Sequence, residues 1–294
     1  MRAFARQMIE RMKAVAAAGA VAAFWLAVWV FVAALVAQPL ILPGPGAVVV
    51  ALLRLVCDVG TWAILAGSGA RILGGLALAA VCGGLLAGIS SRSRAFARLV
   101  APALSFVKAT PVACVVVLLL IWLGSARVSI AAVFLMALPG VYFSLVEGLT
   151  QADKPLEQMF RLHGVQGWRL FCAHTWREVL PFVLSCARAV IGMSWKAGVA
   201  AELIGMATGT VGERIYQAKL LIETADLLAW TVLVVAASWA CERVLVWLLR
   251  ASGPVAWRTA VRAHGRGGRG RACGSAGGGA AAELGEPLCG AGGF

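Results

Sequence analysis

Three ionisable residues, Arg188, Lys196 and Glu202, interrupt one long apolar run of the sequence, the run from Phe182 to Leu203. Lipid does not solvate charge, so ionisable groups at membrane depth usually face other protein groups or a water-filled path. Arg188 could attract an anion there; the alternatives are a buried pair with a neighbouring helix or a side chain that snorkels to the membrane surface. Lys196 and Glu202 are six positions apart and so do not share a helix face. We interpret all three as candidates for lining or bracing a pathway.

Residues that commonly carry catalysis or bind metals are scattered along the chain. None of the cysteines forms a CxxC pair and several lie in apolar runs, which is typical of small buried side chains. The histidines lack metal-ligand spacing, and neither a nucleophile–base arrangement nor a GxxxxGK(S/T) nucleotide-binding loop is visible. We expect no catalytic site, metal or cofactor in this chain. The residues concerned are Cys57, Cys82, Cys114, Cys172, Cys186, Cys241, Cys273, Cys289, His163, His174 and His264.

The composition restricts the class of protein. Of the 294 residues, 61% are hydrophobic and 13% are charged, whereas an ordinary soluble domain has about 25% charged residues. So few charges do not cover the surface of a soluble fold, and lipid as the outer solvent removes that need. The net charge of +13 raises nucleic-acid binding as an alternative. The basic residues lie between apolar runs instead of on one polar face, which favours membrane topology over nucleic-acid binding.

The apolar runs are predicted to be membrane-spanning helices of roughly 20 residues, because lipid requires backbone groups to be paired within the segment and barrel strands would alternate in polarity. The first run is too long for the core of a signal peptide, so we expect it to be retained. Arg71, at the edge of the second run, can snorkel from a helix end. The fold class is therefore all-α and polytopic, with about six transmembrane helices. The runs are Val15–Ala37, Arg71–Ile89, Ala101–Leu123, Ser129–Leu149, Phe182–Leu203 and Leu227–Leu249.

Basic residues cluster on one side of these runs. They are frequent before the first run, in the loops Ser90–Arg98 and Thr150–Pro181, and after the last run, and they are sparse in the other loops. By the positive-inside rule, this distribution places both termini in the cytoplasm. We divide the chain into a basic N-terminus (residues 1–14), a transmembrane domain (residues 15–250) and a Gly/Ala/Arg-rich tail (residues 251–294) that we expect to be disordered.

Proline and glycine predict the sharper features. The sequence Leu42–Pro45 predicts a turn, followed by a short helix at the outer surface over Ala47–Cys57. Two glycine pairs with three residues between their members permit close helix approach. The second pair and the glycine after it could fold a short segment close to an outer gate, and the alternative is a flexible outer loop. The pairs are Gly84 with Gly88 and Gly205 with Gly209, and the later glycine is Gly212.

The loop Thr150–Pro181 is long, basic and amphipathic. Large apolar side chains alternate with arginine, histidine and glutamine in its middle, and Gly164 divides it in two. A helix–turn–helix of this kind would present an apolar face either to another protein or to the lipid surface.

Several motifs resemble, in consistent order over about residues 10–250, the permeases of ABC importers in the nitrate/sulfonate/taurine branch. Those permeases carry a cytoplasmic signature of Glu-Ala-Ala, three residues and Gly, then a short coupling helix and Leu-Pro. The sequence from Gly164 to Phe171 is similar to the family's Gly-Ala-Ser-x-Trp-x-Leu-Phe. Further matching positions are Leu42-Pro43-Gly44-Pro45, Lys108-Ala109-Thr110-Pro111, Trp122-Leu123-Gly124, Trp195, Ala201-Glu202, and Gly205, Gly209 and Gly212.

The resemblance implies a MetI-like permease in the bacterial cytoplasmic membrane that forms the pathway for a small anionic solute such as nitrate, a sulfonate or taurine. The implied partners are an ABC ATPase that uses ATP, an extracytoplasmic substrate-binding protein and a second permease copy. Within the loop, Gly164 would form a tight turn, Trp168, Leu170 and Phe171 would be apolar anchors in a pocket of the ATPase, and Arg169 would form either a rim contact or a contact with a lipid phosphate. The implied ATPase-coupling residues are Gln158, Met159, Phe160, Gly164, Trp168, Arg169, Leu170, Phe171, Leu180 and Pro181. The pathway and gate candidates are Arg188, Lys196, Glu202, Gly205 and Gly209.

Two other functions stay open at this point. The chain has Gln158-Met159-Phe160 where the family has Glu-Ala-Ala, which keeps open a degenerate permease paralogue that does not transport. A secondary transporter driven by an ion gradient would show inverted repeats, and no convincing repeat relates the two halves.

Overall fold

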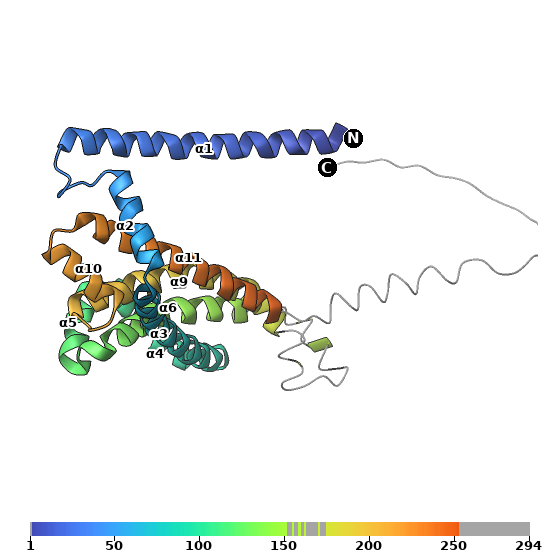
Figure 1. Ribbon diagram of the computed structural model, residues 1–294. Coiled ribbons are helices and arrows are strands. Elements are labelled where there is room, and N and C mark those ends of the chain that lie inside the picture. The colour runs from blue at the N-terminus through green and yellow to red at the C-terminus, as the bar shows by residue number, and fades with distance from the viewer. Residues whose placement is uncertain are drawn as a thin grey trace, which may run out of the picture. The chain divides into compact units, whose positions relative to one another are not determined.

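In this computed structural model, the structure describes residues 2–151 and 175–252 and, between them, residues 155, 158, 159, 162 and 170. The described residues contain helices and no strand, which confirms the all-α class. The predicted disordered tail lies outside these residues, except for the end of the last helix. The helices are α1 (Arg2–Val36), α2 (Pro45–Cys57), α3 (Val59–Arg92), α4 (Arg94–Ala109), α5 (Val112–Leu123), α6 (Ser125–Gln151), α9 (Trp176–Gly205), α10 (Val211–Leu220) and α11 (Thr224–Ser252) (Figure 1).

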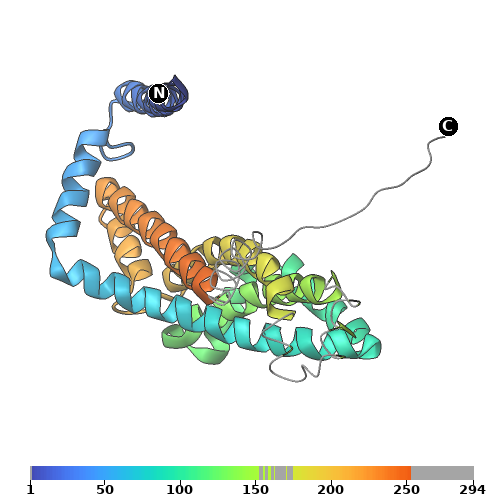
Figure 2. The ribbon, with the colours of Figure 1, turned by 90° about the vertical axis from the view of Figure 1, so that its right-hand side faces the viewer.

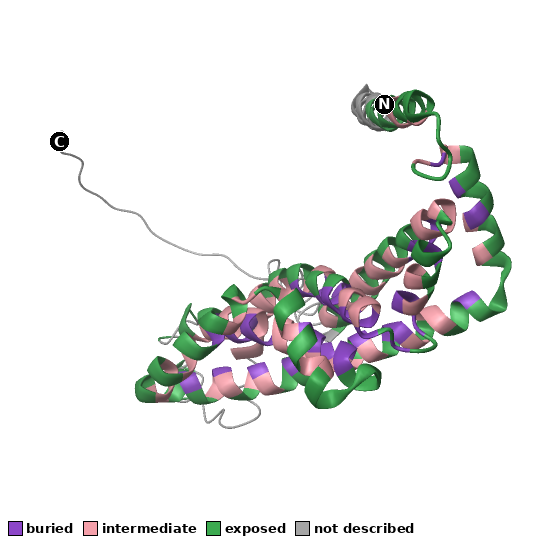
Figure 3. Ribbon diagram, turned by 90° about the vertical axis from the view of Figure 1, so that its left-hand side faces the viewer, coloured by how far each residue is buried: buried purple, intermediate pink, exposed green. Residues whose placement is uncertain are grey.

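Five of these helices, α1, α3, α6, α9 and α11, are long and apolar enough to cross a membrane, and the number is six if the bent pair of α4 and α5 counts as one span. The predicted number of about six spans is therefore confirmed. The described side chains of α1 are exposed along almost the whole helix (Figure 3). In a membrane protein such an apolar surface faces lipid or another chain.

The second span starts earlier than the predicted run Arg71–Ile89, because α3 begins at Val59. The Asp58 carboxylate accepts a 3.0 Å hydrogen bond from the Gly60 backbone nitrogen and caps the helix. The Trp62 indole nitrogen also donates to the Val56 carbonyl oxygen at 2.9 Å. Figure 2 shows the corner at this point, where the short helix α2 is followed by the long α3.

The third span is not the single straight helix predicted over Ala101–Leu123. It consists of α4 and α5, whose axes differ by 102°. Pro111 has no backbone N–H to continue α4, and a residue before proline favours extended backbone, as Thr110 shows with φ −73° and ψ 132°. The Thr110 hydroxyl donates to the Phe106 carbonyl oxygen at 2.9 Å, which satisfies an acceptor at the end of α4.

The core forms where α6 packs against α3 and α9. Glycines allow this close approach: a Cβ on Gly75 would lie 2.5 Å from the Ile130 carbonyl oxygen, and one on Gly198 would lie 2.5 Å from Ile72 Cγ1. The prediction that Gly84 and Gly88 mediate close packing was wrong. A Cβ on Gly84 would come no nearer than 3.9 Å to a neighbouring atom, and one on Gly88 would meet nothing within 4 Å.

Candidate functional site

A buried polar cluster joins α3, α9 and the start of α10. Glu202, in the last turn of α9, is 0% exposed. Its Oε2 accepts a 2.8 Å hydrogen bond from the hydroxyl of Ser68, which is also fully buried. The same hydroxyl oxygen accepts from the Val211 backbone nitrogen at 3.0 Å, and the Gly212 nitrogen donates to Glu202 Oε2 at 3.4 Å. A carboxylate thus compensates the free N–H groups at the start of a helix.

The segment between α9 and α10 is a tight, capped turn. Met206 has φ 45° and Gly209 has φ 68°, both in the left-handed region. The Thr210 hydroxyl oxygen accepts from the Glu213 backbone nitrogen at 3.1 Å, and the Glu213 carboxylate accepts from the Gly209 nitrogen. This arrangement resembles a reciprocal capping box, displaced by one residue on the carboxylate side. The segment predicted as an outer-gate element is therefore an ordered turn rather than a structureless loop.

Three glycines of this region have different surroundings. A Cβ on Gly205 would lie 2.9 Å from Val128 Cγ1 of α6, whereas one on Gly209 would meet nothing within 4 Å. A Cβ on Gly212 would collide with Glu202 Cβ and the Leu203 backbone nitrogen. Gly205 and Gly212 are therefore required by close packing, and Gly209 by its backbone conformation.

Arg71 is part of the same region, although the sequence suggested that it snorkels from a helix end. Because α3 starts at Val59, Arg71 lies about three turns inside the helix. Its guanidinium interacts electrostatically with the Glu202 carboxylate. Arg71 Nη1 and Glu202 Oε1 are both buried, and neither forms a hydrogen bond within the part of the chain that the structure describes. Snorkelling was therefore the wrong expectation.

The predicted pathway residues separate into two groups. Glu202 is buried, whereas Arg188 and Lys196 are exposed on the surface of α9. Lys196 and Glu202 lie on different faces of the helix, as their spacing indicated. Neither Arg188 nor Lys196 has an ion-pair partner among the described residues. Met193, 51% exposed, lies between them along the helix, so this face of α9 combines an apolar surface with two cations.

Only part of the predicted coupling set falls within the described residues. Gln158 and Met159 are exposed, and Leu170 is 6% exposed. Leu180 and Pro181 were expected to close the loop, but α9 begins at Trp176 and includes both of them. Pro181 lies inside α9, where it has no backbone N–H to donate to the Arg177 carbonyl oxygen one turn earlier. Phe160, Gly164, Trp168, Arg169 and Phe171 lie outside the described residues.

The sequence reasoning missed Ser68 and Thr210, which position the Glu202 carboxylate and the turn after it. Their signal in the sequence is weak: Ser68 is one hydroxyl in an apolar, glycine-rich run, and it meets Glu202 across 134 positions. A hydroxyl in an apolar run often bonds only to a carbonyl oxygen of its own helix, as Ser105 does to Ala101. The presence of a serine in such a run therefore does not indicate a contact with another helix.

Comparison with known proteins identifies the family. Residues 80–255 match the family described as binding-protein-dependent transport system inner membrane component. The aliphatic sulfonates transport permease protein SsuC of Escherichia coli (strain K12) is 27% identical over 63% of this chain and 70% of its own length. SsuC of Bacillus subtilis (strain 168) is 28% identical over 69% of this chain and 74% of its own length. The bicarbonate transport system permease protein CmpB of Synechococcus elongatus is 23% identical, over 61% and 65%.

The matched region includes the C-terminal part of α3 and all of α4, α5, α6, α9, α10 and α11, and thus the buried Glu202 and the exposed cations of α9. Multiple membrane-spanning helices and a matching transport family agree with one another and with the predicted MetI-like architecture. The chain therefore belongs to the family of binding-protein-dependent transport system inner membrane components, as a multi-pass transport permease.

Proposed function

We propose that this chain is the permease subunit of an ABC importer and forms the pathway for a small anionic solute of the nitrate, sulfonate or taurine type. The observation that carries the choice of an anion is the exposed face of α9, where Arg188 and Lys196 lie on a membrane-spanning helix without acidic partners among the described residues. Ionisable residues within spans usually face the protein interior or a water-filled path, so we place these two cations at the path and not against lipid.

The names of the relatives support the same class of solute. SsuC is named for sulfonates and CmpB for bicarbonate, and both solutes are anions. A positive path lowers the electrostatic barrier for an anion in a medium of low dielectric constant, where each charge acts strongly. In this proposal Arg188 and Lys196 attract the anion without holding it, because both side chains are exposed and adapt to a moving solute.

The ordered turn from Gly205 to Gly212 acts as the outer gate in this mechanism. Glu202 and Ser68 hold its far end through the Val211 and Gly212 nitrogens. A gate that closes a pathway must return to one defined position, and a buried hydrogen-bonded cluster provides such a position. A second copy of the chain would complete the path by covering the exposed face of α9.

Energy would come from a separate ABC ATPase that binds and hydrolyses ATP, and solute delivery from an extracytoplasmic binding protein. The loop Thr150–Pro181 would receive the ATPase at the cytoplasmic surface, with both termini on the same side. The basic loop Ser90–Arg98, whose Arg92, Arg94 and Arg98 are exposed, supports this orientation.

Uptake of radiolabelled taurine, an alkyl sulfonate, bicarbonate and nitrate into proteoliposomes tests this function. The vesicles contain the chain with the ATPase and binding protein of its host. We expect ATP-dependent uptake of at least one anion, and Arg188→Met and Lys196→Met should each reduce it strongly. The matched control is Arg243→Met, which removes an exposed arginine on α11 that stacks on Trp239 of its own helix at 4.8 Å.

Two results would contradict the proposal. Unchanged anion uptake in the Arg188→Met, Lys196→Met double variant would exclude the cationic face from the path. Uptake that requires an ion gradient and proceeds without ATP would instead indicate a secondary transporter.

A further inference from the structure

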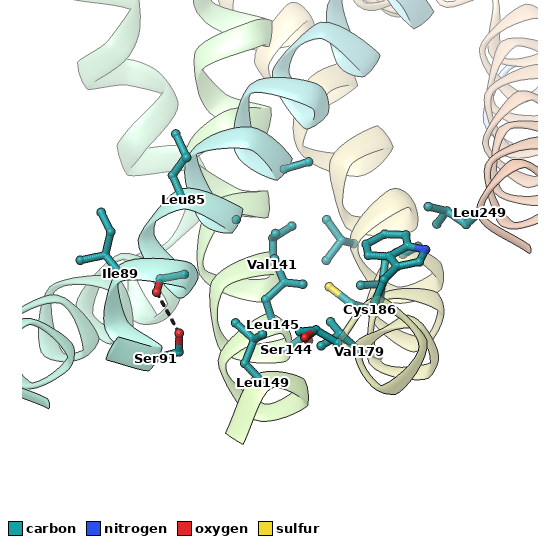
Figure 4. A pocket seen from close by; sticks show the side chains of 18 of the residues that line it. Leu85, Ile89, Ser91, Val141, Ser144, Leu145, Leu149, Val179, Cys186 and Leu249 are labelled. Atoms are coloured by element: carbon teal, nitrogen blue, oxygen red, sulfur yellow. Dashed lines mark hydrogen bonds between the residues drawn. The ribbon is translucent and has the colours of Figure 1, made fainter. Parts of the chain in front are cut away.

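A cavity of about 1270 Å³ lies between α3, α6, α9 and α11, at the end of the bundle that contains Arg92 and Trp176. Figure 4 shows how side chains of all four helices converge on it. Part of the space exists because Gly84 and Gly88 of α3 line it without side chains, and a Cβ on Gly88 would meet nothing within 4 Å. The other walls are mostly apolar: Leu76, Leu145, Val190, Ile191, Leu245 and Leu249.

Among the described residues that line the cavity, the polar side chains of Ser91, Arg92 and Ser93 lie where α3 ends and α4 begins, and Ser144 and Thr175 add two hydroxyl groups. The Ser91 hydroxyl donates to the Gly88 carbonyl oxygen of its own helix at 2.8 Å, whereas Arg92 is exposed. No acidic residue lines the cavity among the described residues. The matching ligand is therefore amphipathic, with a long apolar part and a negatively charged head.

The size and polarity of the cavity restrict its occupant further. It exceeds the range of about 300–1,000 Å³ that holds drug-sized ligands. The space is partly open to the surroundings of the bundle, and its mostly apolar lining offers water few hydrogen-bond partners. The Arg92 end lies at the cytoplasmic membrane surface in the orientation proposed above. Basic pockets between spans at that surface bind anionic lipid head groups.

We infer that this cavity binds one anionic phospholipid of the cytoplasmic leaflet, with an acyl chain between α3, α6, α9 and α11 and the phosphate at Arg92. The same cavity is lined by Leu170, Thr175 and Trp176, which lie within Thr150–Pro181, with Trp176 as the first residue of α9. Leu170 is 6% exposed and thus faces the lipid site instead of the cytoplasm. The bound lipid would therefore support the end of the loop that we propose to receive the ATPase.

A pair of glycine variants on α3 tests the acyl-chain site. Gly88→Leu fills the cavity, whereas Gly74→Leu adds the same side chain to the same helix at a position that has no neighbour within 4 Å and does not line the cavity. The full-length protein is incubated with mixed micelles of phosphatidylglycerol and phosphatidylcholine, then washed in detergent and analysed by native mass spectrometry. We expect wild type and Gly74→Leu to retain phosphatidylglycerol and Gly88→Leu to lose it. Equal retention by the two variants would overturn the site.

A second pair tests the head group and does not depend on the folding of a core variant. Arg92→Gln removes the exposed charge at the cavity, and Arg98→Gln removes a nearby exposed charge of α4 that does not line it. Arg92→Gln should reduce the preference for phosphatidylglycerol over phosphatidylcholine by about fivefold, the effect of one basic residue near a lipid surface. An unchanged preference, or the same change in Arg98→Gln, would overturn the role of Arg92. Both readouts are independent of transport, so a failure of the proposed function leaves this inference testable.

Discussion

The Ser68 hydroxyl of α3 and the Glu202 carboxylate of α9 are joined by a 2.8 Å hydrogen bond, and both side chains are fully buried. The bond connects two membrane-spanning helices at the point where α9 ends and the turn to α10 begins. Since the Ser68 oxygen also accepts from the Val211 nitrogen, one hydroxyl aligns three segments.

Ser68→Ala should destabilise the protein by about 1–3 kcal/mol, because it leaves both a buried carboxylate oxygen and a buried backbone N–H short of a partner. Thermal unfolding in detergent, followed by tryptophan fluorescence, measures the difference. Ser105→Ala is the control, since Ser105 is exposed and bonds only within α4. The control should change stability by no more than about 0.5 kcal/mol. Equal effects of the two variants would show that the Ser68–Glu202 bond does not support the fold.

Adjacent glycines on α3 should respond oppositely to alanine. Gly75→Ala places a Cβ 2.5 Å from the Ile130 carbonyl oxygen and should cost about 1–3 kcal/mol through overpacking. Gly74→Ala meets open space and should stabilise by up to about 1 kcal/mol through helix propensity. Fluorescence-detected size-exclusion chromatography after a heat challenge ranks the variants against wild type. If Gly75→Ala survives as well as Gly74→Ala, α3 and α6 do not pack as closely as described.

Gly212→Ala should disturb the gate turn, since the new methyl group collides with Glu202 Cβ and the Leu203 backbone nitrogen. A stability loss of about 1–3 kcal/mol and a strong reduction in solute uptake are expected. Gly209→Asn is the matched variant: Gly209 has open surroundings and φ 68°, which asparagine tolerates. Uptake into proteoliposomes separates the two. Normal uptake by Gly212→Ala would mean that the Val211–Glu202 region is not part of the gate.

Ile222, in the turn between α10 and α11, has φ 59° and a side chain that is 59% exposed. A β-branched residue in the left-handed region is strained by about 1–2 kcal/mol. Ile222→Gly should therefore stabilise the protein by up to about 1 kcal/mol after the entropy cost of glycine. Leu221→Gly removes a similar exposed side chain at φ −84° and should destabilise instead. Differential scanning fluorimetry compares them, and a lower melting temperature for Ile222→Gly than for Leu221→Gly would contradict this strain.

Hydropathy was sufficient to predict the number of spans, because apolar length is a local property of the sequence, and the Leu42–Pro45 turn was sufficient to predict the short helix α2. It did not predict the 102° bend at Thr110–Pro111, although the proline was visible. Proline ends a helix locally, but the direction that the chain takes afterwards depends on packing against other helices. Similarly, the second span was predicted to begin at Arg71, whereas helix α3 begins at Val59, directly after its cap Asp58.

Contacts between distant segments were the part that the sequence did not reveal. Glu202 stood out as a charge in an apolar run, but nothing in the spacing of residues pointed to Ser68 as its partner. Gly75 and Gly198 lie where α3, α6 and α9 pack closely together. The more conspicuous GxxxG pair, Gly84 with Gly88, lines a cavity instead. Which face of a glycine-rich helix meets its neighbour is decided by the rotation of the helix in the bundle, and a single sequence does not encode that rotation in its apolar pattern.

The most direct measurement is a pull-down of the tagged chain from detergent-solubilised membranes of its native host, with mass spectrometry of the proteins that copurify. We predict an ABC-type ATPase that is retained by wild type and by the Arg243→Met control, and lost when Gly164 and Trp168 of the loop are replaced together. The absence of any ATPase from folded, membrane-inserted protein would contradict the importer function and favour a permease paralogue that does not transport.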